Sequence, residues 1–316
     1  MAAEIAVVVP THRRALRLRW LLLALGEQTL SGDRFETVVV HDGTDAETAT
    51  VLADFPAVRT VEVAAGTGTP ARQRNAGWRA VSAPLVAFTD DDCRPPREWL
   101  EAALRVARDN PGAIVQGATR PDPDEAALLR APGARSLTVD PPELYAQTCN
   151  IVYPRDLLDR LDGFDETFPD PAGEDTDLAL RGQEAGAPYV GAPAALTYHA
   201  VHVSSLRGQL RSLPRWQHLA LVVRRHPAAR RALVFGVFWK PSHAWLTLAL
   251  GGAALRRPAV TAVALAGWAT AARPSYGTGP RARAREVAEL PTRLAVDVAE
   301  MATAVRGSIR YRTLFL

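Results

Sequence analysis

The chain has 316 residues, of which 47% are hydrophobic, and its formal net charge is +3. That is enough apolar material for one large domain or for a domain with an appendage, and it excludes a globally disordered chain. Only two cysteines occur, Cys93 and Cys149, which excludes a disulfide framework and is typical of a reducing compartment.

The first ninety residues alternate strand and helix signals. Short β-branched runs such as EIAVVVP are typical of strands buried on both faces. Helix signals separate them, with Thr44 or Asp45 as the cap of one helix and Pro70 in the first turn of another. This order predicts an α/β fold whose mostly parallel central sheet is covered by helices on both faces. The predicted strands are 4–10, 35–43, 58–64 and 83–92, and the predicted helices are 14–28, 45–55 and 69–81.

Polar residues follow the predicted strands at the edge where ligands bind in such sheets. Carboxylates there can hold a hard divalent cation, while arginines and the cation neutralise phosphates, so this set fits a nucleoside diphosphate. The glycine motifs of a dinucleotide fold and of a P-loop are both missing. The alternative is that the aspartates form a solvated turn or a helix cap. The residues concerned are Pro10, Thr11, His12 and Arg13, then His41 and Asp42, then Asp90, Asp91 and Asp92, with Arg74 on the helix before them.

Five segments, in order, resemble a family 2 glycosyltransferase of the GT-A fold. Together they span roughly residues 4–200, about two thirds of the chain. The segments are VVVPTHRR (7–14), VVVHDGTDAET (38–48), ARQRNAGWRAVSAPLVAFTDDDCRPPREWL (71–100), CNIVYPRDLLDRLDGFDETF (149–168) and GEDTDLALRGQEAG (173–186).

The resemblance implies a role for each polar group at the strand ends. The aspartates would be the family's DxD element, in which Asp92, with Asp90, binds Mn²⁺ or Mg²⁺ and Asp90 or Asp91 faces the sugar nucleotide. Asp42 would contact the base, although the family often has two aspartates where this chain reads His41-Asp42. The nucleotide would also be lined by Pro10, Thr11, Arg13, Arg74 and Asn75.

The segment GEDTDLALR predicts a helix with Glu174 and Asp175 in its first turn. Acidic residues there are often caps. The resemblance instead implies a general base for the acceptor hydroxyl, Asp175 first and Glu174 next, and an inverting reaction. We expect the helix dipole to favour the ionised form of Asp175. In YHAVH, His199, and less so His202, offers a further metal ligand, against the alternative of a structural histidine.

The last third of the chain differs in charge and hydropathy. From Arg207 onward there are 18 basic and 4 acidic residues, a net charge of +14, whereas the first 206 residues carry −11. The basic residues alternate with apolar ones, which favours an anionic membrane surface over nucleic acid. The apolar runs 242–255 and 259–272 are each about 21 Å long as helices, shorter than the roughly 20 residues a span needs. We expect a monotopic or re-entrant hairpin, or alternatively two packing helices of a soluble appendage.

These features predict a GT-A catalytic domain over 1–206 and a basic, apolar, α-helical extension over 207–316. No basic region precedes the first apolar run, so we expect no signal peptide and place the protein on the cytoplasmic face of the cell membrane. The expected donor is a nucleotide-diphosphate sugar, and a lipid-linked acceptor is compatible with this location. The alternatives are an inactive sugar-nucleotide-binding or scaffold protein, which would not need Asp175, and a sugar nucleotidyltransferase, which should have glycine where the chain reads PTHRR.

Overall fold

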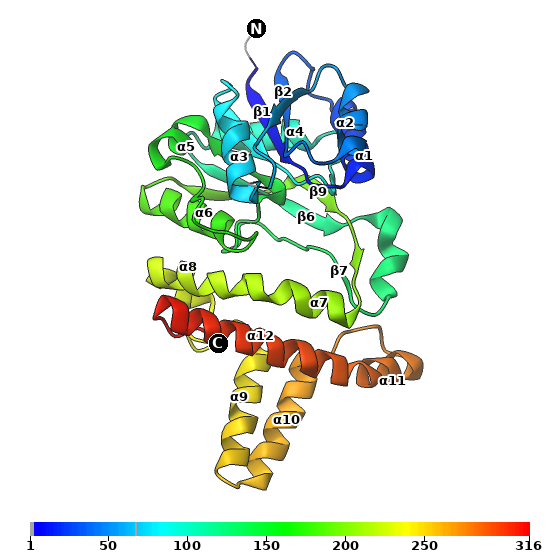
Figure 1. Ribbon diagram of the computed structural model, residues 1–316, viewed down its shortest axis with the longest axis vertical. Helices are drawn as coiled ribbons and strands as arrows, with labels where there is room; N and C mark the ends of the chain where they lie inside the picture. Colours follow the sequence, from blue (N-terminus) through cyan, green and yellow to red (C-terminus); the bar gives the residue numbers. More distant parts are fainter. Residues whose placement is uncertain (1–2, 67) are drawn as a thin grey trace. The chain divides into compact units, whose positions relative to one another are not determined.

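The computed structural model describes residues 3–66 and 68–316. The chain forms two compact units (Figure 1). The first comprises Met1–Leu129 and Arg135–His202, and the second comprises Arg130–Ala134 and Val203–Leu316.

The first unit is built on an eight-stranded sheet in the order β3-β2-β1-β4-β8-β6-β9-β5. Strand β1 pairs in parallel with β2 and β4, β2 with β3, and β6 with β9, while β8 and β5 are antiparallel to their neighbours. The prediction of a mostly parallel α/β fold is confirmed. The strands are β1 (Ile5–Pro10), β2 (Phe35–His41), β3 (Arg59–Glu62), β4 (Leu85–Phe88), β5 (Cys93–Arg94), β6 (Ile114–Pro121), β8 (Ile151–Pro154) and β9 (Tyr189–His199). Two short strands, β7 (Ala134–Arg135) and β10 (His202–Val203), lie outside this sheet.

Helices cover both faces of the sheet because its central strands are apolar on both sides. In β1, Ile5, Val7 and Val9 face one core cluster and Ala6 and Val8 face the other. The first cluster is closed by α1 (Ala15–Gly26), α2 (Ala46–Ala53) and α4 (Trp99–Asp109). The second is closed by α3 (Pro70–Arg79), α5 (Arg155–Leu161) and α6 (Glu174–Glu184). Figure 1 shows α1 and α3 on opposite sides of the sheet.

The local signals at the helix starts are confirmed. Asp45 caps α2 by accepting a hydrogen bond from the Glu47 N–H, and Thr69 caps α3 ahead of Pro70. Strand β4 ends at Phe88, four residues earlier than predicted, so the three aspartates lie in the loop that follows it. Two 3₁₀ helices, η1 (Pro123–Arg130) and η2 (Thr148–Asn150), complete this part of the chain.

The second unit is helical. Its small core joins Leu219, Ala220 and Val223 to Ala304 and Phe315. Between residues 206 and 232 the helical segments are short, and Pro214 and Pro227 lie at the starts of two of them, where proline has no N–H to donate. Two helices occupy most of the region from residue 280 to residue 311, and Pro291 lies in the first turn of the second. The elements are α7 (Leu206–Ser212), η3 (Leu213–His218), α8 (Leu219–Arg225), η4 (Pro227–Ala232), α9 (Pro241–Ala254), α10 (Pro258–Ala272), α11 (Pro280–Ala288) and α12 (Leu290–Tyr311).

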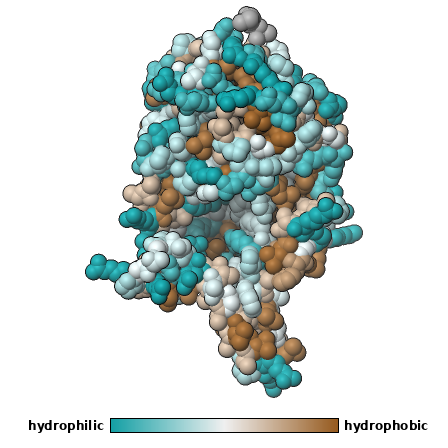
Figure 2. Space-filling view, turned by 180° about the vertical axis from the view of Figure 1, so that it is seen from behind, coloured by the Kyte–Doolittle hydropathy of each residue, from teal (hydrophilic) through white to brown (hydrophobic). Residues whose placement is uncertain are grey.

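Helices α9 and α10 form a hairpin (Figure 1), and hydrophobic residues are prominent on the face of it that Figure 2 shows. Gly267 lies against the Trp245 ring and Gly252 against Thr261, so neither position has room for a side chain. No helix in the described residues is long and apolar enough to cross a bilayer. The exposed large side chains of the hairpin are Trp245, Leu248, Leu250, Leu255, Val260, Val263 and Leu265.

Candidate functional site

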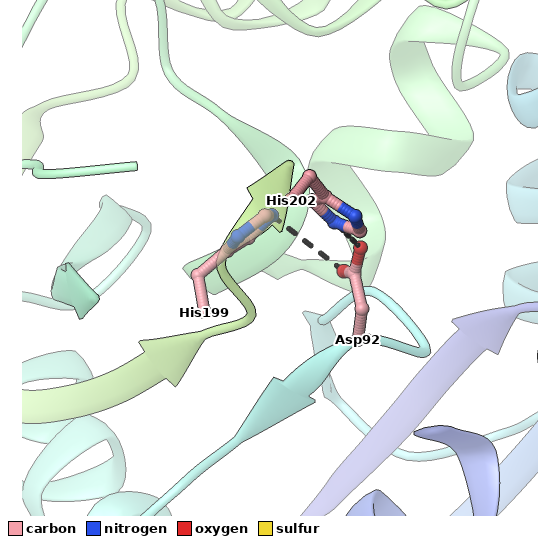
Figure 3. Close-up of side chains that lie close together, drawn as sticks. All are labelled: Asp92, His199 and His202. Atoms are coloured by element: carbon pink, nitrogen blue, oxygen red, sulfur yellow. Dashed lines mark hydrogen bonds and ion pairs between the residues drawn. The ribbon is translucent and has the colours of Figure 1, made fainter. Parts of the chain in front are cut away.

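A carboxylate and two imidazoles meet at one edge of the sheet of the first unit (Figure 3). Asp92 lies in the loop after β4, His199 ends β9, and His202 belongs to β10. The pairing of Cys93 with His199 brings the end of β9 beside this loop. The Asp92 Oδ2 lies 2.9 Å from His202 Nε2, and its Oδ1 lies 3.6 Å from His199 Nε2. One ligand atom from each of the three residues lies within 4.8 Å of the others.

The chemistry of this cluster fits a divalent cation. His199 Nδ1 lies 2.9 Å from the Ala200 carbonyl oxygen, which can only accept a hydrogen bond, so Nδ1 donates and Nε2 is the ring nitrogen that faces Asp92. The Asp92 Oδ1 is buried and accepts no hydrogen bond within the described residues. A carboxylate oxygen without a hydrogen-bond partner, beside an imidazole whose orientation is fixed, is a suitable ligand pair for Mn²⁺ or a similar ion.

Arg14 brings a positive charge to the same carboxylate. Its Nη1 donates to Asp92 Oδ2 at 2.6 Å and to Asp91 Oδ1 at 3.0 Å. Burial alone would raise the pKa of Asp92, but the hydrogen bond from His202 and the charges of His199 and Arg14 hold that pKa well below its usual range. Asp92 is therefore ionised at neutral pH.

The other two aspartates of the triplet have different partners. Asp91 is 4% exposed, and its Oδ2 accepts a hydrogen bond from Thr11 Oγ1 at 2.8 Å. Burial raises the pKa of Asp91 to about 6. Asp90 lies outside the histidine cluster, and its Oδ1 accepts from Arg74 Nη2 at 2.9 Å. Its predicted contact with a metal stays a prediction.

The residues predicted to line a nucleotide follow β1 and β2. Pro10 ends β1 in register with Val40, and the hydrogen bond from Thr44 is the main cause that lowers the pKa of Asp42. His12 Nδ1 lies 3.2 Å from Asp42 Oδ2. Arg13 adopts a left-handed conformation with φ of 53°, which is strained for a residue with a side chain and is common in binding loops.

Arg74 connects this edge to the acid pair at the start of α6. It is 5% exposed, and its Nη1 donates to Glu174 Oε1 at 3.0 Å while its Nη2 donates to Asp90. The second oxygen of Glu174 is buried without a hydrogen-bond partner in the described residues, and burial raises the pKa of Glu174. One buried guanidinium therefore links the strand-end carboxylates to the helix-start carboxylates.

Asp175 shows that one expectation was wrong. Its Oδ1 accepts a hydrogen bond from the Thr176 N–H at 2.8 Å, as a residue at a helix start can. Burial, together with the neighbouring Glu174 charge, nevertheless raises the pKa of Asp175 to about 8. The helix terminus and Arg74 do not outweigh these two causes, so the ionised form is disfavoured at neutral pH.

Asn75 positions a loop. Its Nδ2 donates to the Phe164 carbonyl at 2.8 Å, and its Oδ1 accepts from the Phe164 N–H at 2.9 Å and from Trp78 Nε1 at 2.9 Å. Gly163 has a φ of 67° and lies so close to Asn75 that a side chain would not fit. The buried amide thus holds the GFDETF loop that leads to α6, and the predicted contact with a nucleotide stays a prediction.

The sequence analysis missed Arg14 and gave His202 little weight. Arg14 looked like the first residue of a helix, and its position directly after the strand-end residues Pro10–Arg13 was the available signal. Another group that could hold a metal ion, His243, Asp297 and Glu300 in the second unit, has the ammonium group of Lys240 beside it. There Lys240 Nζ lies 2.6 and 2.7 Å from the two Glu300 oxygens.

Comparisons with known proteins agree with this architecture. Residues 6–161 match the model of glycosyl transferase family 2. Validoxylamine A glucosyltransferase of Streptomyces hygroscopicus is 26% identical over 271 residues, covering 74% of this chain and 63% of the relative. The pre-mycofactocin glycosyltransferase of Mycobacterium tuberculosis is 29% identical over 262 residues, covering 78% and 53% respectively. The chain thus spans only part of the length of these curated relatives.

Solved structures show the same fold. The mannosyltransferase PcManGT from Pyrobaculum calidifontis, in complex with GDP-Man and Mn²⁺, superposes with a TM-score of 0.59 at 21% identity, covering 99% of this chain and 88% of that one. Residues 1–349 of Staphylococcus aureus TarS, in complex with UDP, superpose with a TM-score of 0.53 at 16% identity, covering 98% of this chain and 91% of that one. The chain therefore carries a glycosyl transferase family 2 domain, built on the GT-A fold, in its first unit.

Proposed function

We propose that this protein transfers a sugar from a nucleoside-diphosphate sugar to an acceptor hydroxyl, in an inverting and metal-dependent reaction. The observation that carries the proposal is the Asp92–His199–His202 cluster at the strand ends of a family 2 domain. In the same loop, Asp90 is linked through Arg74 to Glu174 of the acid pair of α6. Relatives of the chain are named as glycosyltransferases, and a protein of the same fold binds GDP-Man with Mn²⁺.

The residues at the strand ends would bind the donor. Asp92, His199 and His202 would hold a divalent cation, which when bound supplies a Lewis acid for the leaving diphosphate. Arg14 and the Thr11 loop lie at the same edge, where a guanidinium can pair with phosphate oxygens. Asp42 keeps an ionised carboxylate for hydrogen bonds from the base or ribose.

The residues at the start of α6 would act on the acceptor. Asp175 accepts the proton of the acceptor hydroxyl as the new bond forms from its oxygen to the anomeric carbon. The bond from that carbon to the diphosphate oxygen breaks in the same step, so the configuration inverts. Arg74 holds Glu174 and Asp90 at fixed places on either side of itself, which positions Asp175 relative to the donor.

The test is a panel of UDP- and GDP-sugars incubated with the purified protein, with Mn²⁺ or with EDTA. We expect release of UDP or GDP from one donor, its loss in EDTA, and its restoration by Mn²⁺. Asp92→Asn should abolish the release while the circular dichroism spectrum stays unchanged. Release that is equally fast in EDTA and in the variant would contradict the metal role, and no release from any donor would favour the scaffold alternative.

We further propose that the second unit holds the enzyme at an anionic membrane surface, on the cytoplasmic face. Exposed apolar side chains gather on the α9–α10 hairpin, and exposed apolar patches of this kind often mark sites of membrane contact. Arg256 and Arg257 lie at its turn, and the net charge of +14 from Arg207 onward favours anionic lipid. Helices of 14 and 15 residues suit an interfacial or re-entrant hairpin.

Vesicle flotation tests the membrane role independently of activity. We expect the protein to float with vesicles containing phosphatidylglycerol, and high salt to release only part of it, because apolar burial is not screened. The double variant Leu250→Asp, Val263→Asp should stay at the bottom of the gradient. Leu16→Asp, at an equally exposed position of α1, is the control and should float. Flotation of the hairpin variant at the wild-type level would contradict the proposal.

A further inference from the structure

Arg14 lies beside Asp92, the carboxylate that would bind the cation. Its Nη1 is 2.6 Å from Asp92 Oδ2, an oxygen of the carboxylate that completes the histidine cluster. The same nitrogen is 3.0 Å from Asp91 Oδ1. Asp92 thus has a positive charge beside it already, supplied by the chain itself, while its other oxygen accepts nothing in the described part of the chain.

The arginine is free to change partners. Its side chain is 46% exposed, and it sits at the N-terminal boundary of α1, directly after the strained Arg13. Among the described residues, only Nη1 of the guanidinium donates hydrogen bonds, and only to these two aspartates. The remaining nitrogens are therefore available to another acceptor without any loss of contacts within the protein.

We infer that Arg14 is a built-in substitute for the divalent cation: it neutralises Asp92 in the resting protein and moves to the diphosphate of the donor when the cation binds. This inference rests on the proposed function. A divalent ion at Asp92 repels a guanidinium a few ångströms away, whereas two phosphates beside it attract the guanidinium. The planar guanidinium is well suited to phosphate oxygens, and Asp91 can keep one contact during the movement.

This mechanism predicts effects of opposite sign for one substitution. Without nucleotide, Arg14→Ala removes the competitor for Asp92, so Mn²⁺ should bind about twofold to fivefold more tightly, the value of a half-exposed ion pair. With saturating Mn²⁺, a nucleoside diphosphate should bind about tenfold to a hundredfold more weakly, because a charge-assisted hydrogen bond to phosphate is lost. A residue with a purely structural role would weaken both.

The experiment is titration calorimetry of Mn²⁺ alone, and of UDP and GDP in the presence of Mn²⁺. The wild type, Arg14→Ala and Arg14→Gln are compared, and Arg14→Gln keeps the length of the side chain should the alanine variant fold poorly. Arg19→Ala is the matched control: Arg19 lies on the same helix and pairs with Asp54, so the variant loses the same charge away from the cluster. We expect wild-type constants from the control.

Two results would overturn the inference. Mn²⁺ binding that weakens or stays unchanged in both Arg14 variants would show that the arginine does not compete for Asp92. Nucleotide binding that stays unchanged would show that it does not move to the phosphates. If neither UDP nor GDP binds the wild type, the proposed function is at fault, and the Mn²⁺ titration still decides whether Arg14 and the ion compete.

Discussion

Asp92 is buried and Asp175 is partly buried in the first unit, and their pKa values shift in opposite directions. Burial raises the pKa of each. Around Asp92, the hydrogen bond from His202 and the charges of His199 and Arg14 outweigh burial. Around Asp175, the neighbouring Glu174 adds a second negative charge, and Arg74 donates its hydrogen bonds to Glu174 and Asp90.

The difference shows that the neighbouring charges and hydrogen bonds, more than the extent of burial, set the pKa of each carboxyl group and so its chemical role. A carboxylate that stays ionised beside imidazoles can hold a cation. A carboxyl group whose pKa lies near neutrality can exchange a proton with a substrate, because a base is most effective with a pKa near the working pH. The following predictions test this division of roles, from the largest expected effect to the smallest.

Asp175→Asn should lower transfer by about 10²–10⁴-fold, since the proton acceptor is lost. The folded state holds the Asp175 proton up to about pH 8, whereas the unfolded state releases it near its ordinary pKa, so the wild type loses stability as pH rises between these values. The neutral variant should therefore melt at or above the wild-type temperature at pH 8, and the difference should shrink toward pH 5.

Turnover and thermal melting of this variant should be measured on one preparation. Donor affinity is the internal control and should stay near wild type. An Asp175→Asn protein that melts several degrees lower while its folded fraction turns over normally would assign Asp175 to capping α6, and Glu174 would become the candidate base.

His199→Ala should weaken Mn²⁺ binding by at least about tenfold to a hundredfold, the range known for residues that only support a ligand. His202→Ala should weaken it less, because no described residue fixes the second ring nitrogen of His202, whereas Ala200 fixes that of His199. Manganese titrations of both variants give the comparison. A larger loss in His202→Ala would reverse the assignment of the leading imidazole.

The value of kcat/KM should rise by about tenfold between pH 7 and pH 9. The reason is that Asp175 must lose its proton in the free enzyme before this residue can act as a base. The sign follows from a raised pKa, since the active form is the deprotonated one. Initial rates at fixed, saturating Mn²⁺ give the profile. A rate that is flat from pH 5 upward would mean that Asp175 is ionised throughout.

Asn75→Ala should destabilise the first unit by about 1–3 kcal/mol, because two backbone groups of Phe164 would lose their partner. The free energy of unfolding in urea measures this. The rate of sugar transfer should fall because the GFDETF loop is displaced, while the affinity for Mn²⁺ alone stays at its wild-type value. Weaker Mn²⁺ binding would extend the role of Asn75 to the strand-end cluster.

The strands, helices and most of the site were predictable because they depend on local patterns. The β-branched runs, the Asp45 cap, Pro70 in the first turn of α3 and the acidic start of α6 each identify an element without knowledge of its neighbours. Because strand ends of a parallel sheet meet at one edge, the Asp90–Asp92 loop and the Thr11 loop could be placed together.

The parts that could not be predicted depend on chain bends and on burial. His199 and His202 are three residues apart, a spacing that puts side chains on opposite faces of a continuous strand. The chain leaves the strand at Ala200, and this brings both imidazoles to Asp92. The pKa of Asp175 depends on burial and on the hydrogen bonds of Arg74, neither of which is visible in the sequence.

The protonation states of Asp92 and Asp175 can be observed directly by NMR of protein labelled with ¹³C at the aspartate carboxyl groups, in EDTA, with Asp92→Asn and Asp175→Asn assigning the signals. From about pH 5 to pH 9, the Asp92 signal should stay at the position of an ionised carboxylate, and the Asp175 signal should move with a midpoint near pH 8. Two signals that both stay constant over this range would mean that Asp175 is ionised like Asp92, and would contradict the division of roles between them.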